Sequence, residues 1–315
     1  MTMQYPELSG NRFFITPKDP NYPKMFYELE DPPDIYVLGD PKALEEPGVS
    51  VIGARKATPY GIACARMAAR CAVEHGLTVV SGAAMGCDQA GQIEAMRRGG
   101  RVVCVLGTGA NVAYPKSSYD LLTYAATTPG CAVISLLPWD SQPQRWAFKK
   151  RNELIAAASL ILVVCEAGCP SGTMSTCEVS DMLGHTICVF PGSVFSPNSA
   201  GSNMLIQQGA QVFLGKDDLD IAFTMYYGSM CLRSPREQKP SGGEEDNQEE
   251  PLSAILVKAL MASPMKLGDI SAGLEYNAID IMRELSALEI QGTVVRLTDG
   301  RYSISENSYL RSANE

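Results

Sequence analysis

The chain has 315 residues and a formal net charge of −9, which is long enough for two domains and a substantial core. Its 45% hydrophobic and 19% charged residues are typical of a globular protein, and no apolar run reaches the length of a membrane span. The acidic balance argues against indiscriminate nucleic-acid binding, so any such contact needs a focused basic patch. Residues 1–6 lack the basic and apolar regions of a signal peptide, and we expect a cytoplasmic protein without a membrane partner.

Apolar runs rich in β-branched residues predict seven strands: Val49–Ile52, Leu77–Val80, Arg101–Leu106, Cys131–Leu137, Leu160–Cys165, Thr186–Phe190 and Gln211–Leu214. Stretches with helical spacing lie between them, among them Ile62–His75, Gln89–Arg98 and Thr173–Leu183. This alternation indicates an α/β domain over residues 49–233, with a doubly wound, mostly parallel sheet covered on both faces. Ligands of such sheets bind beyond the carboxyl ends of the strands. Residues 1–48 are expected to form an N-terminal arm.

Residues 234–251 contain no large apolar side chain and are expected to form a flexible acidic linker. Helical periodicity and a hairpin signal follow it, at Leu252–Met261, Lys266–Ala272, Ala278–Glu289 and then Thr293–Leu297 with Arg301–Ser305 around Asp299-Gly300. Three helices followed by a hairpin predict a small winged-helix domain over residues 252–315.

The charge of this C-terminal domain argues against contact with DNA. Residues 252–305 contain five Lys or Arg and six Asp or Glu, and the expected recognition helix has Asp280, Glu284 and Glu289 against Arg283 alone. Phosphates would repel that helix. We therefore expect this domain to dock a protein or to regulate.

Residues 145–152 read Arg-Trp-Ala-Phe-Lys-Lys-Arg-Asn and form the most basic segment of the chain. Cations neutralise phosphates and aromatic rings stack on unpaired bases, so the segment suits single-stranded nucleic acid. The alternative is an amphipathic helix start in which Trp146 and Phe148 are core and the cations are solvated.

Two loops at predicted strand ends could hold an anion. The first, Gly53–Gly61, contains Arg55 and Lys56 and leads into a helix with Pro59 near its first turn. It is not G-x-G-x-x-G and no acidic residue ends the second strand, so a nicotinamide cofactor is not expected; a plain strand-to-helix turn is the alternative. The second, with Ser171, Gly172 and Thr173, lacks the Walker lysine and is weak alone.

The chain shows no catalytic set and no metal motif. It has ten cysteines without a C-x-x-C pair and only two histidines, and most cysteines lie in apolar runs, as in a reducing cytosol. Neither histidine lies on a strand-end loop with a nucleophile as a partner. Of the carboxylates in loops, Asp88 is expected to cap the following helix, and Glu166 stands apart from it. We therefore expect neither an enzyme nor a bound cofactor or metal.

The order of motifs from about Tyr22 to Leu214 resembles the DprA/Smf family of DNA-processing proteins. The matching segments are Tyr22-Pro23, Asp31-Pro-Pro33, Ile35-Tyr36, Gly39, Gly53-Ala-Arg55, Thr58-Pro-Tyr-Gly61, Thr78-Val-Val-Ser-Gly82, Gly86-Cys-Asp88, Val105-Leu-Gly-Thr-Gly109, Tyr114-Pro115, Phe148, Arg151-Asn152, Ile155-Ala156, Ser171-Gly-Thr173, Pro191-Gly-Ser193, Gly201-Ser-Asn203, Leu205-Ile206 and Gly209-Ala210. The resemblance implies a Rossmann-like homodimer that binds single-stranded DNA and helps to load a RecA-type recombinase in natural transformation or recombination. The family also commonly ends in a winged helix.

The resemblance implies a DNA pocket made of Arg55 and the adjoining Lys56, of Arg145, Phe148, Lys149, Arg151 and Asn152, and of Ser171, Gly172 and Thr173. Arg55, Arg145, Lys149 and Arg151 would neutralise phosphates and Phe148 would contact a base, whereas Trp146 is expected in the core or in dimer packing. Two cations that are usual in the family are replaced by Met85 and Pro170.

Two other functions stay open at this point. The less basic pocket suits a Rossmann-like nucleotide-ligand sensor, possibly in a defence system. A phosphoribohydrolase is disfavoured, because Thr176 stands where the glutamate of the Gly-Gly-x-Gly-Thr-x-x-Glu loop would be, and Glu178 comes two places late.

Overall fold

The computed structural model describes residues 5–228, 251–274 and 276–312, and nine of its strands form one sheet. The strand order is β1-β2-β6-β5-β4-β3-β7-β8-β9, in which β1 (Arg12–Ile15) and β2 (Ile35–Gly39) form an antiparallel edge. The parallel strands are β3 (Gly48–Ile52), β4 (Thr78–Ser81), β5 (Val102–Leu106), β6 (Ala132–Ser135), β7 (Ile161–Val164), β8 (Thr186–Val189) and β9 (Gln211–Val212). The predicted α/β, mostly parallel fold is confirmed.

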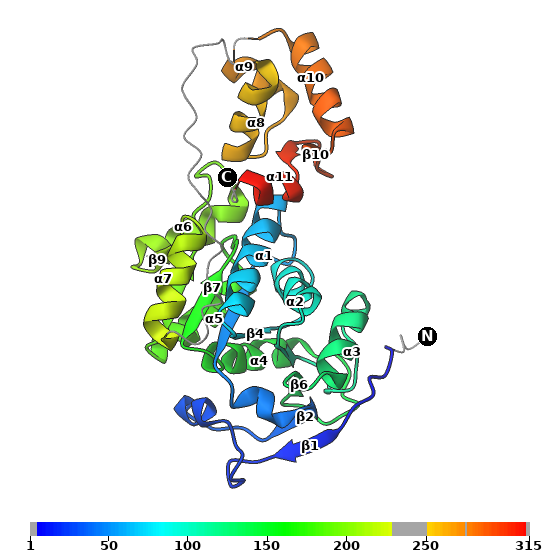
Figure 1. Cartoon of the computed structure of the whole chain (residues 1–315), viewed down its shortest axis with the longest axis vertical. Coiled ribbons are helices and arrows are strands. Elements are labelled where there is room, and N and C mark those ends of the chain that lie inside the picture. Colours follow the sequence, from blue (N-terminus) through cyan, green and yellow to red (C-terminus); the bar gives the residue numbers. More distant parts are fainter. Residues whose placement is uncertain (1–4, 229–250, 275, 313–315) are drawn as a thin grey trace.

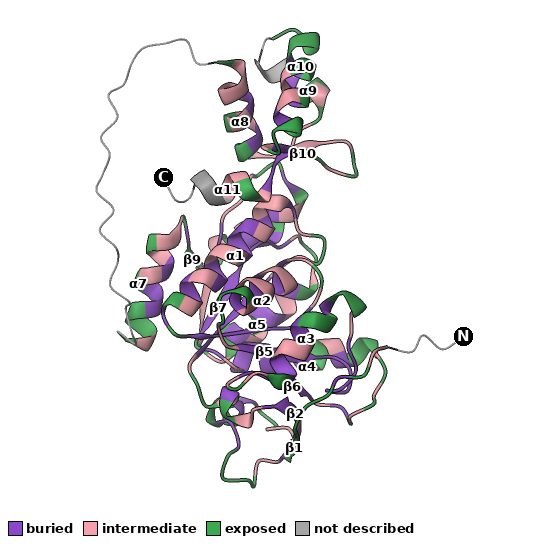
Figure 2. Ribbon diagram, turned by 45° about the vertical axis from the view of Figure 1, so that its right-hand side comes forward, coloured by how far each residue is buried: buried purple, intermediate pink, exposed green. Residues whose placement is uncertain are grey.

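Helices cover both faces of the sheet (Figure 1), as the continuous apolar strands require. One face is packed by α1 (Pro59–Glu74), α2 (Cys87–Arg97), α3 (Tyr119–Thr127) and α7 (Lys216–Tyr227), and the other by α4 (Arg145–Ala157), α5 (Gly172–Met182) and α6 (Ala200–Gln207). Successive side chains of a strand reach opposite layers: Val51 packs with α1, and Ile52 packs with α4. The buried residues therefore form a band through the middle of the molecule (Figure 2).

The N-terminal residues differ from the expected arm, because residues 12–15 and 35–39 belong to the sheet. Ile35, Val37 and Leu38 are fully buried, and short 3-10 helices at Lys24–Glu28 and Pro41–Leu44 pack beside the sheet. These strands are hard to predict from the sequence, because each has only four or five residues and β2 follows two prolines. The expected boundary before residue 49 therefore does not mark the edge of the sheet.

The C-terminal residues build a second core. It contains α8 (Leu252–Ala262), α9 (Leu267–Leu274), α10 (Ala278–Ile290) and an antiparallel pair, β10 (Val294–Arg296) with β11 (Tyr302–Ile304), packed around Leu256, Ile281 and Leu285. The predicted helices and hairpin are confirmed, while the winged-helix assignment stays a prediction. Of the expected linker 234–251, all but the last residue lies outside the described residues.

The last helix, α11 (Glu306–Ser312), joins this C-terminal unit to the start of α1. Glu306 forms an ion pair with Arg66, and the rings of Tyr60 and Tyr309 meet edge to face with centroids 5.5 Å apart. The C-terminal unit therefore lies at the end of the sheet domain opposite β1 (Figure 1). No helix within the described ranges is long and apolar enough to cross a membrane.

Candidate functional site

The strand order reverses between β3 and β7, and this reversal opens a cleft at their carboxyl ends. From β3 the chain builds the sheet toward β6, and from β7 it builds toward β9, so the loops after β3 and β7 diverge. A cleft of about 660 Å³ lies there. It is lined by the loop after β3, the start of α2, one face of α4 and the loop between β7 and α5.

Nine of the ten residues that the sequence predicted for the site line this cleft: Arg55, Lys56, Phe148, Lys149, Arg151, Asn152, Ser171, Gly172 and Thr173. The spacing on α4 explains the grouping, because Phe148, Arg151, Asn152 and Ile155 recur at intervals of three and four and share one helix face. Arg145 is the exception: it is exposed at the first position of α4 and does not line the cleft.

Phe148 and Arg55 form the aromatic and cationic centre of the cleft. The guanidinium carbon of Arg55 lies 5.5 Å from the centroid of the Phe148 ring, an arrangement that favours cation–π attraction. The ring also packs against Tyr114 at 5.5 Å, and a Cβ at Gly107 would come within 2.6 Å of it. Phe148 is half-buried, so it combines a fixed orientation with an accessible surface.

Arg151 lies beneath the cleft as a buried cation. Its side chain is 5% exposed, and Nη1 donates a hydrogen bond to the carbonyl oxygen of Val105 at 3.0 Å. Glycine at position 82 leaves room for this guanidinium, since a Cβ there would lie 1.4 Å from Nη1. Burial raises the pKa of Asp88 and lowers the pKa of Arg151, and each charge counteracts the shift of the other. The Arg151 guanidinium therefore lies under the floor of the cleft, out of direct reach of solvent, with the Asp88 carboxylate as its counter-charge.

Glu166 holds the loop that presents Arg55 and Lys56. Its carboxylate accepts hydrogen bonds from the backbone N–H and the hydroxyl of Thr58 at 2.7 and 2.6 Å, and its carbonyl oxygen accepts from the N–H of Ala54 at 2.7 Å. Burial raises the pKa of Glu166, while the two bonds from Thr58 oppose that shift. Thr58 caps α1, so the same contacts fix the start of that helix.

The part of the cleft lined by α4 and the start of α5 offers neutral hydrogen-bonding groups. Asn152 Nδ2 donates to Ser175 Oγ at 3.1 Å, which ties α4 to the first turn of α5. Ser171 Oγ is buried and has no hydrogen-bond partner among the described residues. With the backbone N–H groups that open the 11-residue helix α5, it could bind an anion.

The expected cap at Asp88 is wrong, and of the two placements expected for Trp146, core or dimer packing, the structure excludes the core. Trp146 is 58% exposed, so it is not a core residue of this chain; its Nε1 donates to Gln144 Oε1. Asp88 does not cap α2, because Gly86 occupies the cap with a φ of 88° and Asp88 accepts instead from the N–H of Gly82 at 3.3 Å. Sequence reasoning also passed over Asn198, which reaches the cleft from the loop after β8 and has no motif of its own.

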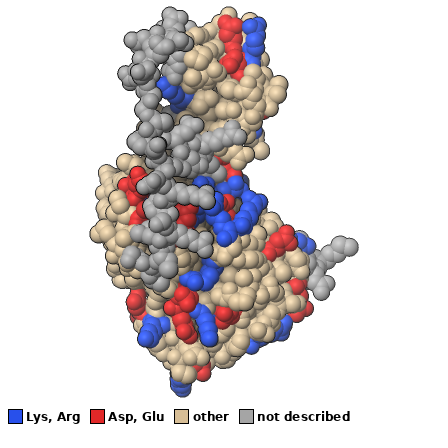
Figure 3. All heavy atoms as spheres, viewed as in Figure 1, with Lys and Arg blue, Asp and Glu red and all other residues tan. Residues whose placement is uncertain are grey.

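The face of the molecule drawn in Figure 3 carries basic and acidic side chains interspersed, with the basic ones gathered most densely near the middle of the molecule. A net charge of −9 therefore coexists with local concentrations of cations. Basic residues outnumber acidic ones in the lining of the cleft, where the charged residues are Arg55, Lys56, Lys149 and Arg151 against Asp88.

The fold and the cleft together define a Rossmann-like protein with a cationic and aromatic cleft at the switch point of its sheet. The chain belongs to the DNA recombination-mediator protein A family, whose model matches residues 13–224.

Relatives from several bacteria support this assignment. Protein Smf of Synechocystis is 33% identical over 214 residues, which cover 66% of this chain, so the chain matches about half (53%) of the length of that relative. The DNA processing protein DprA of Streptococcus pneumoniae is 32% identical over 202 residues, covering 64% of this chain and 71% of the relative.

Two solved structures share the fold. The crystal structure of the Streptococcus pneumoniae protein superposes with a TM-score of 0.62 at 31% identity, covering 67% of this chain and 73% of the other. DNA processing protein A of Helicobacter pylori, whose single-stranded DNA binding mode has been described as unique, gives a TM-score of 0.62 at 26% identity, covering 70% and 98%.

Proposed function

We propose that this protein is a single-stranded-DNA-binding recombination mediator, not an enzyme. The observation that carries the proposal is the pairing of Arg55 with the half-buried ring of Phe148 in a cleft lined by three further cations. Cations and an accessible aromatic ring are the two groups that grip an unpaired strand. Two similar proteins support this proposal: one is named a DNA processing protein, and the other, from Helicobacter pylori, is described by its single-stranded DNA binding mode.

Each wall of the cleft takes a separate part in binding. Arg55, Lys56 and Lys149 neutralise phosphates, and a base stacks on the Arg55–Phe148 pair. Asn152, Ser171 and the N–H groups at the start of α5 bind polar groups of the strand. Arg151 adds positive electrostatic potential from below the cleft. It does not contact the strand directly, because its guanidinium is buried and already bound to the carbonyl oxygen of Val105.

The bound strand is then protected and handed to a RecA-type recombinase by a homodimer in the cytoplasm. The dimer surface that we propose is α7 with the adjoining edge of the sheet, where Leu214, Ile221 and Met225 are 80%, 59% and 76% exposed. The C-terminal unit takes a docking or regulatory part, because α10 is acidic where a DNA-reading helix would be basic.

A titration with labelled oligomers tests the proposal. Fluorescence anisotropy on the full chain, with single-stranded and duplex oligomers at two salt concentrations, should show tighter binding of the single strand, because duplex bases hide their faces. Equal affinity for both forms would refute the aromatic cleft as a single-strand site.

A nucleotide-ligand sensor is the second candidate. The exposed Met85 and Pro170 beside the cleft remove two cations, and a volume of about 660 Å³ is in the range of small-molecule sites. A mononucleotide that binds as tightly as a short oligomer would favour this function. The phosphoribohydrolase is not supported, because the cleft places Thr176 and no glutamate among its lining residues.

A further inference from the structure

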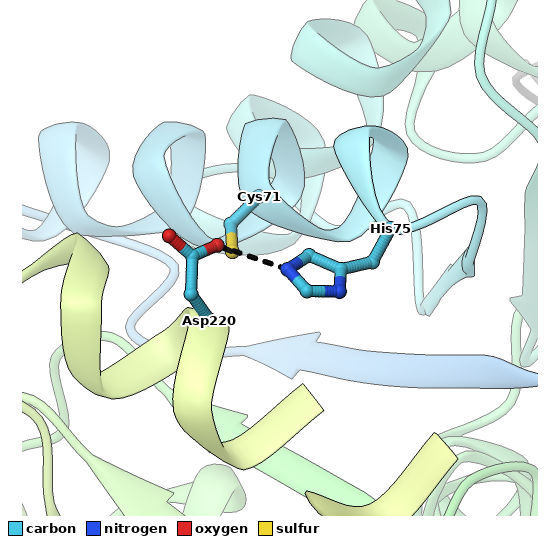
Figure 4. A group of neighbouring side chains, drawn as sticks. All are labelled: Cys71, His75 and Asp220. Carbon is cyan, nitrogen blue, oxygen red and sulfur yellow. Dashed lines mark hydrogen bonds and ion pairs between the residues drawn. The ribbon is translucent and has the colours of Figure 1, made fainter. Parts of the chain in front are cut away.

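Away from the cleft, Cys71, His75 and Asp220 bring a thiol, an imidazole and a carboxylate together (Figure 4). Cys71 and His75 are four residues apart at the end of α1 and share one face of that helix, while Asp220 comes from α7. Asp220 Oδ1 lies 2.9 Å from Cys71 Sγ and 2.9 Å from His75 Nε2. The three atoms lie within 4.8 Å of one another.

Neighbouring side chains hold these three groups in place. The ring of Phe223 packs edge to face on His75 with centroids 5.7 Å apart, which directs Nε2 toward Asp220. Lys216 Nζ binds the other carboxylate oxygen, Oδ2, at 2.6 Å and reaches Glu74 at 3.2 Å. Asp220 Oδ1 is therefore the oxygen that faces Cys71 and His75, and a partner outside the group orients its carboxylate.

We propose that Cys71, His75 and Asp220 form a zinc site that joins α1 to α7. Thiolate, imidazole and carboxylate are the ligands of protein-bound Zn²⁺, at about 2.0–2.3 Å from the ion. Tetrahedral ligands at those lengths lie about 3.3–3.8 Å apart, so the two 2.9 Å contacts need to open by less than about 1 Å to admit the ion. Cys71 and His75 are buried, whereas Asp220 is 32% exposed, so a water molecule can take the fourth position on the solvent side.

Binding exchanges a proton for the metal. Without metal, the Cys71 thiol donates a hydrogen bond to Asp220 Oδ1 at 2.9 Å. When Zn²⁺ enters, the sulfur–hydrogen bond breaks, a zinc–sulfur bond forms and the proton leaves to solvent. The Nε2–H of His75, which faces the Asp220 carboxylate before metal binding, is lost as the neutral ring takes the tautomer protonated at Nδ1, so that Nε2 coordinates through its lone pair, and Asp220 coordinates through Oδ1. The ion then links residues 149 positions apart in the chain, so it should stabilise the folded state.

The test uses Co²⁺ as a spectroscopic probe and Zn²⁺ as its competitor, on the full chain freed of metal by chelation. We expect one equivalent of Co²⁺ to produce a sulfur-to-cobalt charge-transfer band, and one equivalent of Zn²⁺ to abolish it and to raise the melting temperature. Cys71→Ser should remove the band. Cys169→Ser is the matched control, because that exposed cysteine lies outside the cluster, and it should keep the band.

Asp220→Asn is a second variant in case Cys71→Ser fails to fold. The amide keeps the shape of a partly exposed side chain, so this variant should fold. It should melt as a folded protein yet bind Co²⁺ and Zn²⁺ more than about tenfold more weakly, because removal of even an outer partner of a ligand has effects of that size. The proposal is overturned if no stoichiometric band forms. It is also overturned if Asp220→Asn binds metal as the parent does, or if Zn²⁺ leaves the melting temperature of the parent chain unchanged.

Discussion

At the scale of single residues, the cleft depends on a contrast between Arg55 and Arg151. Both line it, yet Arg55 is exposed and stacked on Phe148, whereas Arg151 is 5% exposed and bound to the carbonyl of Val105. The local sequence does not distinguish the two, because each is a cation beside small or polar residues. Only the exposed one can exchange counterions freely, and the two should therefore respond differently in binding experiments.

We predict that Arg55→Ala weakens single-strand binding and lowers the salt slope by about 0.7, because one phosphate contact is lost. Anisotropy titrations over a range of salt concentrations measure both changes. Lys150→Ala is the control: Lys150 belongs to the same basic segment but pairs with Glu153 at 2.7 Å and does not line the cleft. An unchanged slope in Arg55→Ala would remove the loop after β3 from the DNA site and favour the nucleotide sensor.

We predict that Phe148→Ala weakens binding by about 1–3 kcal/mol and leaves the salt slope almost unchanged, because stacking releases no counterions. Its melting temperature must be compared first, since the ring also packs on Gly107 and Tyr114. Trp146→Ala removes an exposed aromatic ring of the same helix outside the cleft and should bind as the parent does. A Phe148→Ala protein that melts normally and binds normally would contradict the stacking role.

At the scale of elements, the start of α1 depends on the buried carboxylate of Glu166 from the end of β7. Because burial raises its pKa, the folded protein retains a proton on Glu166 at pH values where the unfolded chain has lost it. Its contribution to the free energy of unfolding is therefore complete below the ordinary glutamate pKa and falls as the pH rises through the folded value.

Glu166→Gln should remove that pH dependence. We expect the stability of the parent relative to Glu166→Gln to decline as the pH rises from about 4.3, the ordinary glutamate pKa, toward neutrality. Urea unfolding at a series of pH values gives the difference directly. A constant or rising difference would show that the hydrogen bonds from Thr58, not burial, dominate the ionisation of this group.

Helix α7 presents more exposed apolar surface than its packing on the sheet uses. Leu219 and Phe223 are buried, whereas Ile221 and Met225 point outward. If this face forms the dimer, Met225→Glu should place a charge in the interface and shift the protein to monomers in analytical ultracentrifugation. Met182→Glu, at an equally exposed methionine of α5, is the control and should leave the dimer intact. A parent protein that sediments as a monomer at tens of micromolar would refute the dimer.

At the scale of the whole molecule, an acidic chain concentrates cations at the switch point of its sheet. The C-terminal unit packs on the start of α1 through Glu306 and Tyr309, next to the loop that carries Arg55. Its expected lack of DNA affinity and its position beside the loop are both consistent with a docking or regulatory part. Because the cations gather in the cleft, binding of single-stranded DNA should depend strongly on salt concentration in spite of the negative net charge of the chain.

Much of this architecture follows from the sequence alone. Seven strands were predicted within a few residues, because buried parallel strands are short continuous apolar runs between glycine-rich turns. The resemblance to the DprA/Smf family implied ten site residues, and nine of them line the cleft. Their meeting also has a physical reason, because the carboxyl ends of parallel strands lie at one edge of the sheet and the loops after successive strands converge there. Arg145 was the exception, since it lies at the first position of α4, about one turn before Phe148, and does not reach the cleft.

The tertiary structure decided what depends on partners far apart in the chain. β1 and β2 are strands because they pair with each other and because β2 also pairs with β6, about a hundred residues on, whereas their own short runs carry too little signal. Arg151 became a buried cation because Gly82 leaves room for it and Val105 accepts its hydrogen bond. Cys71, His75 and Asp220 meet only when α7 packs on α1. Local periodicity records which side of an element is apolar, whereas burial of a charge and the meeting of ligands are set by contacts that no local pattern encodes.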